Sequence, residues 1–530
     1  MPGDSFDYVI VGAGSAGAVL AARLSEDPAV TVCLLEAGGE ADADEVMIPA
    51  AFSTMFKTRW DWNYETTEQK QLNGRRAYWP RMKALGGCSS MNAMIYIRGN
   101  RADYDAWRDQ YGAAGWGYDD VLPYFVKAEH NTRLGGPLHG QQGPLHVEDR
   151  VYTHELSQAF VDSAVSGGLK PTDDFNGAEQ EGAGLYQVTC KKGRRWSVNE
   201  GYLKSVRSRD NLTVQTGAFA TRIELDGSGG SSRATGVTFR QAGTEHTVHA
   251  TREVLLSGGS INSPQLLMLS GIGPASHLAE VGVESRVDLA GVGANLQDHP
   301  AAGFLWYTKG TTDIAQLNNV RNFVRWKARG TGPLSSNVGE AGAFFGSRDG
   351  LAAPDIQIHT APAGFYDNGL HEPTRSMVTV ATTLVGVASR GSIRLRSADP
   401  AWHPAIDSAY FDDQADLDAM LAGMKRTWEL STQGALAAYL DEPWQVSATP
   451  SDEEIVEHIR TWTQTLYHPT STCAMGNGED AVVDAELRVR GVEGLRVVDA
   501  SVMPAVPRGN TNAPTIMVGE KAADLIKESR

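Results

Sequence analysis

The chain has 530 residues, of which 41% are hydrophobic and 21% are charged, a balance typical of a soluble globular enzyme with two large domains or one elaborated domain. The formal net charge is -17 and no block of Lys and Arg stands out, which argues against nucleic acid or an anionic membrane as a partner. No apolar run is long enough to span a bilayer, and four scattered cysteines without a CxxC pair argue against a metal site. Because the first strand-like run begins at Phe6, too early to follow a signal peptide, we expect a cytoplasmic protein.

The first predicted element is a βαβ unit with a glycine-rich turn. Residues 6–12 predict a buried strand and residues 16–27 a helix. Three glycines with the GxGxxG spacing lie at this turn: Gly12, Gly14 and Gly17. Such a turn lets the backbone approach a pyrophosphate at the start of the helix. The next strand, within residues 30–39, contains Glu36, whose carboxylate would bind ribose hydroxyls and repel a 2′-phosphate. The unit therefore predicts FAD or NAD rather than NADP.

A second segment of small residues follows at 82–100. Gly86 and Gly87 would let the backbone approach a flat ligand closely, and Asn92 can hydrogen-bond the edge of that ligand. A simple NAD dehydrogenase has no second segment of this kind. The pair of segments therefore favours FAD, the cofactor that would lie along more of the domain.

Further strands and helices follow along the chain. A hairpin is predicted around a Gly/Ser turn at 227–232, with strands at 221–227 and 233–241. The other predicted elements are a buried strand at 252–260, a helix at 262–270, an alternating strand at 391–397, an amphipathic helix at 412–431, a strand at 495–504 and a final helix at 515–528.

Several stretches of the chain, in this order, together resemble the glucose-methanol-choline (GMC) family of flavoprotein oxidoreductases. They are VGAGSAGAVLAARLSED with LLEAGG, ALGGCSSMNAMIYIRG, GGSINSPQLLMLSGIGP, LAGVGANLQDHP, YHPTSTCAMG, and LRVVDASVMPAVPRGNTNAPTIMVGEKAADLI. The resemblance implies an α/β fold with a Rossmann-like FAD-binding domain built from separated segments, and a substrate domain with an antiparallel sheet and helices. The implied FAD-binding parts are 1–150, 192–300 and 464–530, and the implied substrate parts are 151–191 and 301–463.

The resemblance also implies which residues form the site. The expected FAD-binding residues are Gly12, Gly14, Ser15, Gly17, Glu36, Ala37, Gly86, Gly87, Ser90, Asn92, Ala93, Met94, Asp499, Ala500, Asn510 and Thr511. Trp62, Ala301, Leu466 and Tyr467 are expected to line the substrate pocket. For His299, within LQDHP, the sequence leaves two interpretations open: the residue lines the site, or it belongs to a turn.

The resemblance places the catalytic pair at His468 and Asn510. Oxidation of an alcohol removes the hydroxyl proton, together with a hydride that flavin N5 can accept. A neutral imidazole can accept a proton near neutral pH, so His468 is the expected base. Asn510 can hydrogen-bond the substrate oxygen while negative charge develops on it.

Two positions depart from the choline oxidase branch of the family, which the chain otherwise resembles. Met91 stands where that branch has a His linked covalently to the flavin, so FAD is expected to be held non-covalently. Ala301 stands where that branch has a Glu that faces the ammonium group of choline. Trp62 and Tyr467 could form part of an aromatic cage for a cation, but without the carboxylate a neutral primary alcohol fits better.

The expected function is that of an FAD-dependent alcohol oxidase, which converts a primary alcohol to the aldehyde and passes the electrons to O2 to give H2O2. An alcohol or choline dehydrogenase with another electron acceptor stays open as an alternative. A flavin-binding lyase and a non-catalytic flavin carrier are the alternatives from other classes. Family members are often dimers, so a homodimer is possible.

Overall fold

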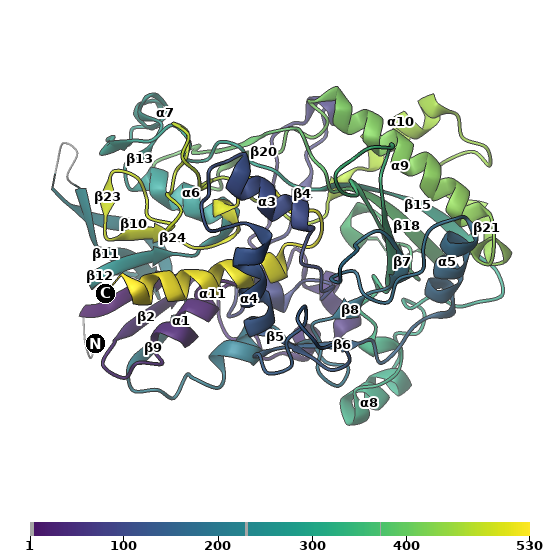
Figure 1. Ribbon diagram of the computed structural model, residues 1–530, viewed down its shortest axis with the longest axis horizontal. Coiled ribbons are helices and arrows are strands. Elements are labelled where there is room, and N and C mark those ends of the chain that lie inside the picture. Colours follow the sequence, from purple (N-terminus) through teal and green to yellow (C-terminus); the bar gives the residue numbers. More distant parts are fainter. Residues whose placement is uncertain (1–4, 228–231, 372, 530) are drawn as a thin grey trace.

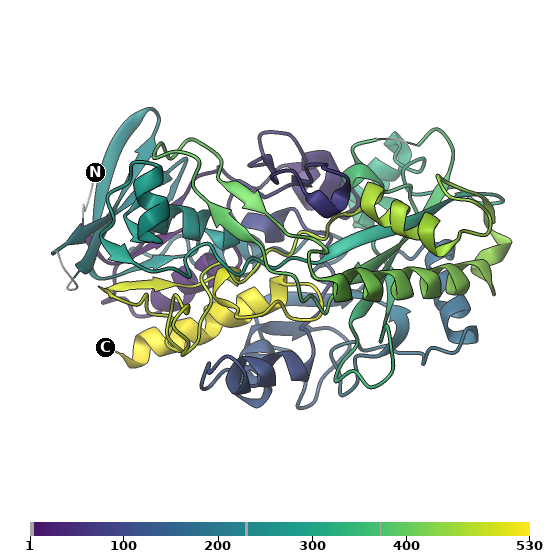
Figure 2. The same ribbon diagram turned by 90° about the horizontal axis from the view of Figure 1, so that it is seen from above.

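The computed structural model describes residues 5–227, 232–371 and 373–529. Two large sheets lie toward opposite ends of an elongated molecule, with helices against both (Figures 1 and 2). The first and last long helices, α1 (Gly17–Leu24) and α11 (Asn512–Glu528), pack against each other beside the first sheet. This mixed arrangement confirms the predicted α/β fold class.

The first sheet carries the glycine-rich turn. Its strands, in spatial order, are β10 (Phe219–Asp226), β11 (Ser232–Gln241), β12 (Thr244–Leu256), β1 (Ser5–Val11), β2 (Val32–Glu36) and β9 (Leu212–Thr216), with β23 (Val492–Glu493) on β11 and β24 (Leu495–Val497) on β12. The strands β12, β1, β2 and β9 run parallel. Since β2 is buried along its whole length, it reads as a continuous apolar run up to Glu36.

The second sheet is antiparallel. Its strands, in spatial order, are β21 (Leu440–Pro443), β15 (Pro300–Thr308), β18 (Met377–Leu384), β17 (Ile356–Ala361), β16 (Ala341–Phe345) and β7 (Gly182–Leu185), with β22 (Gln464–Thr465) on β15. Helices α9 (Gln414–Thr432) and α5 (Glu155–Ser166) pack on this sheet. The predicted helix at 412–431 is therefore confirmed.

The remaining elements lie outside the two large sheets. The helices are α2 (Asp44–Met47), α3 (Arg101–Asp109), α4 (Tyr118–Ala128), α6 (Gly259–Leu269), α7 (Ala275–Glu280), α8 (Val320–Arg329) and α10 (Asp452–Trp462). The small sheets pair β3 (Tyr64–Glu65) with β4 (Tyr78–Trp79), β13 (Ile272–Gly273) with β14 (Val287–Asp288), β19 (Ser392–Arg394) with β20 (Ala405–Asp407), and β6 (Leu145–Asp149) with β5 (Glu129–Asn131) and β8 (Gln187–Val188).

Several predicted boundaries were wrong by a few residues. The predicted strand at 252–260 is the second half of β12, whose first half pairs antiparallel with β11. The predicted strand at 495–504 ends at Val497, because the Asp499 side chain accepts a hydrogen bond from the Ser501 amide and starts a 3₁₀ turn. The predicted hairpin is present as β10 and β11, but residues 228–231 of its turn lie outside the described residues.

The two sheets draw their strands from separated parts of the chain, and we keep the predicted division into FAD-binding and substrate parts as a proposal. One detail differs from it: β22 (Gln464–Thr465) belongs to the second sheet, although residues 464–530 were assigned to the FAD-binding part. Among the described residues, no helix combines the length and the apolar character needed to cross a membrane.

Candidate active site

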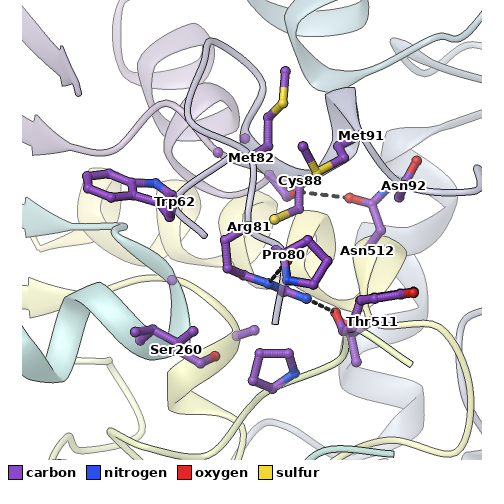
Figure 3. A pocket seen from close by; sticks show the side chains of 18 of the residues that line it. Trp62, Pro80, Arg81, Met82, Cys88, Met91, Asn92, Ser260, Thr511 and Asn512 are labelled. Atoms are coloured by element: carbon purple, nitrogen blue, oxygen red, sulfur yellow. Dashed lines mark hydrogen bonds between the residues drawn. The ribbon is translucent and has the colours of Figure 1, made fainter. Parts of the chain in front are cut away.

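One large cavity is lined from both sheets. The carboxyl ends of β1, β2 and β12 contribute one part of its wall, and β15, β17 and β18 contribute another. The predicted residues that line it are Gly12, Gly14, Ser15, Glu36, Ala37, Trp62, Gly87, Asn92, Ala93, Met94, Ala301, Leu466, Tyr467, His468, Asp499, Ala500, Asn510 and Thr511. Figure 3 shows Trp62 on one side of this pocket and Met91 and Asn92 on the other, with Arg81 and Cys88 between them in that view. The structure thus brings most of the predicted residues around a single cavity.

The first end of the cavity is built on the glycine-rich turn and on Glu36. The Glu36 carboxylate accepts hydrogen bonds from the Ala13 amide at 3.0 Å and from the Gly38 amide at 2.7 Å, which fix its orientation at the end of β2. Burial raises the pKa of Glu36, and the two amides oppose this shift by stabilising the charged form. This end therefore has the shape and the acceptor group that an adenosine ribose needs.

The two glycine-rich segments touch each other. A Cβ atom on Gly87 would lie 2.7 Å from the Gly14 Cα atom, so a side chain at Gly87 would separate the segments. A Cβ atom on Gly14 would meet no heavy atom closer than 4.0 Å, because this glycine faces the cavity. The turn therefore packs tightly against the second segment, and at Gly14 it leaves free space on the side of the cavity.

Three buried polar atoms at the cavity wall lack a hydrogen-bond partner among the described residues: Ser257 Oγ, Ser260 Oγ and His359 Nε2. A buried polar atom without a partner costs about 1–3 kcal/mol, so such atoms mark places where a ligand completes the hydrogen bonding. Together with the open turn and the Glu36 carboxylate, these atoms fit FAD better than an empty structural cavity.

Three predicted FAD-binding residues do not line the cavity. A Cβ atom on Gly17 would lie 1.9 Å from the Gly12 carbonyl oxygen, so this glycine is needed for the tight turn itself. Gly86 has a φ of +89°, which a glycine adopts readily, and Ser90 is fully buried and donates to the Leu85 carbonyl at 2.9 Å. These three residues shape the two loops from behind the cavity wall, and their part in FAD binding stays a prediction.

His468 and Asn510 face each other at the other end. Asn510 Nδ2 lies 3.3 Å from His468 Nε2, and Gln357 Nε2 donates to Asn510 Oδ1 at 3.3 Å. The Gln357 amide therefore turns the Asn510 amide nitrogen toward the imidazole. In this arrangement Asn510 donates and His468 Nε2 accepts, so Nε2 is the unprotonated nitrogen.

His299 does not line the cavity but lies behind His468. The two Nδ1 atoms are 3.0 Å apart and the rings stand perpendicular, at 90°. Since one of the two nitrogens must donate, a proton on His468 Nδ1 that His299 accepts is consistent with an unprotonated Nε2 on His468. The question that the LQDHP motif left open is thus answered: His299 holds the ring of His468.

The His468 imidazole is neutral in this environment. Burial lowers the pKa of His468 well below the usual 6.5, and the nearby His299 and His359 lower it further because positive charges would repel each other. Burial likewise lowers the pKa of His299 and of His359 to about 3. A buried trio of neutral imidazoles is therefore expected at physiological pH.

The backbone around His468 is held by two ionisable side chains. Asp298 accepts a hydrogen bond from the His468 amide at 2.7 Å and another from the Thr465 hydroxyl at 2.5 Å, and it also bonds the Tyr410 hydroxyl. Arg81 donates to the Tyr467 carbonyl at 2.7 Å. Together they fix the segment just before the predicted base.

Aromatic rings line the cavity near Tyr467. Phe56 lies 5.7 Å from Tyr467 and 6.0 Å from Phe52 between ring centroids, and Phe52 lies 5.7 Å from Phe365. Trp62 belongs to another group: its ring stacks on Tyr64 and contacts Phe219. Trp62 and Tyr467 thus line the same cavity but pack with different rings, and their sharing of one aromatic cage stays a prediction.

Sequence reasoning missed several residues of this site. Gln357, His359 and Ala361 alternate along β17 with Ile356 and Ile358. The pattern QxH within an apolar strand indicates one polar face, and this signal could have been found in the sequence. Phe52, Phe56, Phe365 and Arg81 have no comparable signal. Among the described residues, no group of three or more His, Cys, Asp and Glu side chains could hold a metal ion.

Comparisons with known proteins point to one family. Models of the GMC oxidoreductase family match residues 6–301 and 387–519. An uncharacterised GMC-type oxidoreductase of Mycobacterium tuberculosis is 43% identical over 529 residues, which cover 98% of this chain and 99% of the relative. The mitochondrial choline dehydrogenase of Homo sapiens is 41% identical, with 99% and 90% of the two chains covered. The structure of a formate oxidase variant from Aspergillus oryzae, studied for its FAD modification, is similar with a TM-score of 0.93, 28% identity, and 99% and 98% coverage.

Proposed function

This chain belongs to the GMC oxidoreductase family, and we propose that it is an FAD-dependent oxidase that converts a neutral primary alcohol to the aldehyde. One observation carries the proposal: the neutral imidazole of His468 and the amide of Asn510 face the same cavity that the glycine-rich turn and Glu36 open into. That cavity therefore joins a dinucleotide site to a base and a hydrogen-bond donor.

The residues of this chain have separate roles in the proposed reaction. When bound, FAD supplies the acceptor for the hydride that leaves the carbon next to the hydroxyl group. The substrate hydroxyl would lie on the cavity side of this pair, His468 and Asn510, within reach of both side chains; it would donate its proton to His468 Nε2 and accept a hydrogen bond from Asn510 Nδ2 in place of the bond that joins the two side chains. His299 orients the imidazole from behind, and Gln357 orients the amide. The organic product would be the aldehyde, and with dioxygen as the final electron acceptor the second product would be hydrogen peroxide.

The charges around the cavity favour a neutral substrate. Ala301 is small and buried at its wall, and the rings of Phe52, Phe56 and Phe365 make the neighbouring surface apolar. The two carboxylates at the wall, Glu36 and Asp499, lie at the ends of β2 and β24, where the dinucleotide is expected, and both accept hydrogen bonds from backbone amides. No carboxylate is therefore left to face an ammonium group among the described lining residues.

A choline dehydrogenase is the second candidate, because the human relative that bears this name is 41% identical over nearly the whole chain. In that case the aromatic rings near Tyr467 would have to bind the cation without a carboxylate. A flavin-binding lyase is the candidate from another class. The homodimer and the cytoplasmic location stay predictions.

A panel of alcohols assayed in parallel for hydrogen peroxide and for dye reduction tests the proposal. Anaerobic addition of a neutral primary alcohol should bleach the visible absorbance of the flavin, and air should restore it with one peroxide per aldehyde. Dye reduction without peroxide would favour the dehydrogenase. Flavin that stays oxidised with every alcohol would favour the lyase or carrier.

Replacing Ala301 with Glu should change the preferred substrate. The new carboxylate would lie at the cavity wall and attract a cation. The ratio of kcat/KM for choline to kcat/KM for the neutral alcohol that has a tert-butyl group in place of the trimethylammonium group should therefore rise roughly ten-fold, the effect of ~1.4 kcal/mol of charge attraction. Ala301→Gln adds similar volume without charge and serves as the control. An equal change in both variants would show that Ala301 does not face the substrate.

Acid precipitation of the holoprotein should release the yellow colour into the supernatant. Met91 lines the cavity beside Cys88 and offers a thioether, which is not expected to form the covalent bond that a His forms with the flavin. The absorbance of the supernatant and the mass of the precipitated protein measure the outcome. A protein mass increased by that of FAD would contradict non-covalent binding.

A further inference from the structure

Helix α8 (Val320–Arg329) carries two parallel rows of exposed side chains that the proposed function does not use. One row is basic and consists of Arg321, Arg325 and Arg329, and the other is apolar and consists of Val320, Val324 and Ala328. Residues four apart lie on the same face of a helix, so each row forms a continuous stripe and the two stripes adjoin. We call this surface the α8 ridge. Figure 1 shows α8 at the periphery, standing off from the second sheet.

The fold holds this ridge in a fixed position. Trp326 is fully buried on the opposite face, contacts Ile48 and Leu334, and donates from Nε1 to the Gly193 carbonyl at 2.9 Å. Arg194 covers the Trp326 ring and donates to the Lys327 carbonyl at 2.8 Å near the end of the helix. The exposed rows are therefore presented by an anchored helix rather than by a flexible loop.

Helix α8 has unusually many exposed apolar side chains: Val320 and Val324 belong to the ridge, whereas Phe323 lies beside it, with its ring centroid 6.3 Å from that of Trp326. Among the described residues, five large hydrophobic side chains are exposed, and three of them lie on α8: Val320 at 80%, Val324 at 58% and Phe323 at 37%. The other two, Val151 and Trp402, belong to other segments. Clustered exposed apolar groups indicate an interaction surface, whereas single ones do not.

The charge of the ridge is opposite to that of the protein. Residues 320–329 contain four cationic side chains and no acidic one, in a chain of net charge -17. Lys327 is paired with Asp44, but within the described part of the chain Arg321, Arg325 and Arg329 form no ion pair. Three guanidinium groups without an acidic partner thus lie beside the exposed valines.

A second copy of this chain is a poor occupant of the ridge. Contact between two α8 helices would bring two rows of arginines together, and like charges destabilise such an interface. Contact with another face would need a second exposed apolar patch, and outside α8 the described residues offer only Val151 and Trp402. An anionic lipid bilayer meets both requirements, because its phosphates attract arginine and its interface accepts valine side chains.

We propose that α8 docks this protein on the surface of an anionic lipid bilayer, with Val320 and Val324 in the headgroup region and the arginine row on the lipid phosphates. This inference goes beyond the proposed function and does not depend on it. It revises the expectation drawn from the sequence, in which the net charge of -17 and the lack of a Lys/Arg block argued against an anionic membrane. At physiological ionic strength a charge acts on the bilayer only within about 8 Å, so the local charge of α8 decides the interaction and not the net charge. The arginines are four residues apart and become one surface only on the helix.

Co-sedimentation of the full-length holoprotein with vesicles tests this proposal. The protein should bind vesicles that contain phosphatidylglycerol, bind pure phosphatidylcholine vesicles much more weakly, and dissociate in high salt. Each arginine near an anionic surface changes the partition about five-fold, so R321E/R325E/R329E should lower binding by more than ~100-fold. V320S/V324S should lower it by roughly ten-fold.

Matched variants separate the ridge from general effects. R240E/R348E/R396E changes the net charge equally at exposed arginines elsewhere, and Val151→Ser removes an exposed valine elsewhere; both should bind as the wild type does. Unchanged flavin absorbance and unfolding temperature verify that each variant is folded. The proposal is overturned if the wild type does not bind phosphatidylglycerol vesicles or if the α8 variants bind them as strongly as the controls do. It is also overturned if the wild type ignores the vesicles and forms a dimer that the α8 variants abolish, because a second copy would then occupy the ridge.

Discussion

Replacing His468 with alanine should slow the reduction of bound FAD by alcohol by at least about 100-fold. The imidazole faces the cavity next to Asn510, and its Nε2 is the expected acceptor of the substrate proton. Without it, a water molecule would have to take that proton. Anaerobic stopped-flow measurement of the flavin absorbance gives this rate directly and does not depend on the electron acceptor.

His468→Gln separates the loss of the base from the loss of its hydrogen bonds. A glutamine amide can still bond Asn510 and His299, but it cannot accept a proton, so both variants should be equally slow. Their FAD content and their reduction by dithionite should match those of the wild type. If His468→Gln kept the wild-type rate, His468 would be a positioning residue and another group would be the base.

The pH dependence of the same rate follows from the lowered pKa of His468. The imidazole must be neutral to accept a proton, and its pKa lies well below 6.5 in the folded protein. Protonation therefore begins only in acid, and the rate of flavin reduction should be constant from about pH 8 down to 6.5 and fall below that. A rate that falls with a midpoint at or above 6.5 would contradict this assignment.

Much of the site could be predicted because its residues belong to short local patterns. Gly12, Gly14 and Glu36 lie on one βαβ unit, where spacing along the chain determines their position in space. His468 and Asn510 were found through the family resemblance, and the structure places them 3.3 Å apart between Nε2 and Nδ2. Local spacing and motif order thus accounted for the two ends of the cavity.

The residues that connect these ends could not be predicted in this way. His359 reaches the cavity, and Gln357 reaches the Asn510 amide, only because β17 pairs with β16 and β18. Such long-range pairing is not encoded in a short window of sequence. Asp298 acts on the His468 amide, a contact 170 residues apart along the chain. Trp62 lines the cavity, and its contact with Phe219 is likewise made only by the fold.

Replacing Gly14 with valine should weaken FAD binding by roughly 100-fold, the change that ~3 kcal/mol of overpacking produces. A Cβ atom at this position would meet no heavy atom of the protein closer than 4.0 Å, so the added carbons would enter the cavity where a pyrophosphate is expected. The purified variant should be nearly colourless. Titration of the apoprotein with FAD, followed by quenching of tryptophan fluorescence, measures the change in affinity.

Two other glycines separate loss of the cofactor from loss of the fold. Gly12→Val should destabilise the protein itself, because Gly12 has a φ of +98° and its Cβ atom would lie 2.4 Å from the Ser257 carbonyl oxygen. Gly39→Val should neither destabilise the protein nor weaken FAD binding, since Gly39 is exposed and a Cβ atom there would meet no heavy atom within 4 Å. A Gly14→Val protein that unfolds at the temperature of the wild-type apoprotein but binds no FAD would identify the turn as the cradle. Full FAD content in that variant would place the pyrophosphate elsewhere, and Glu36 would then lose its expected partner.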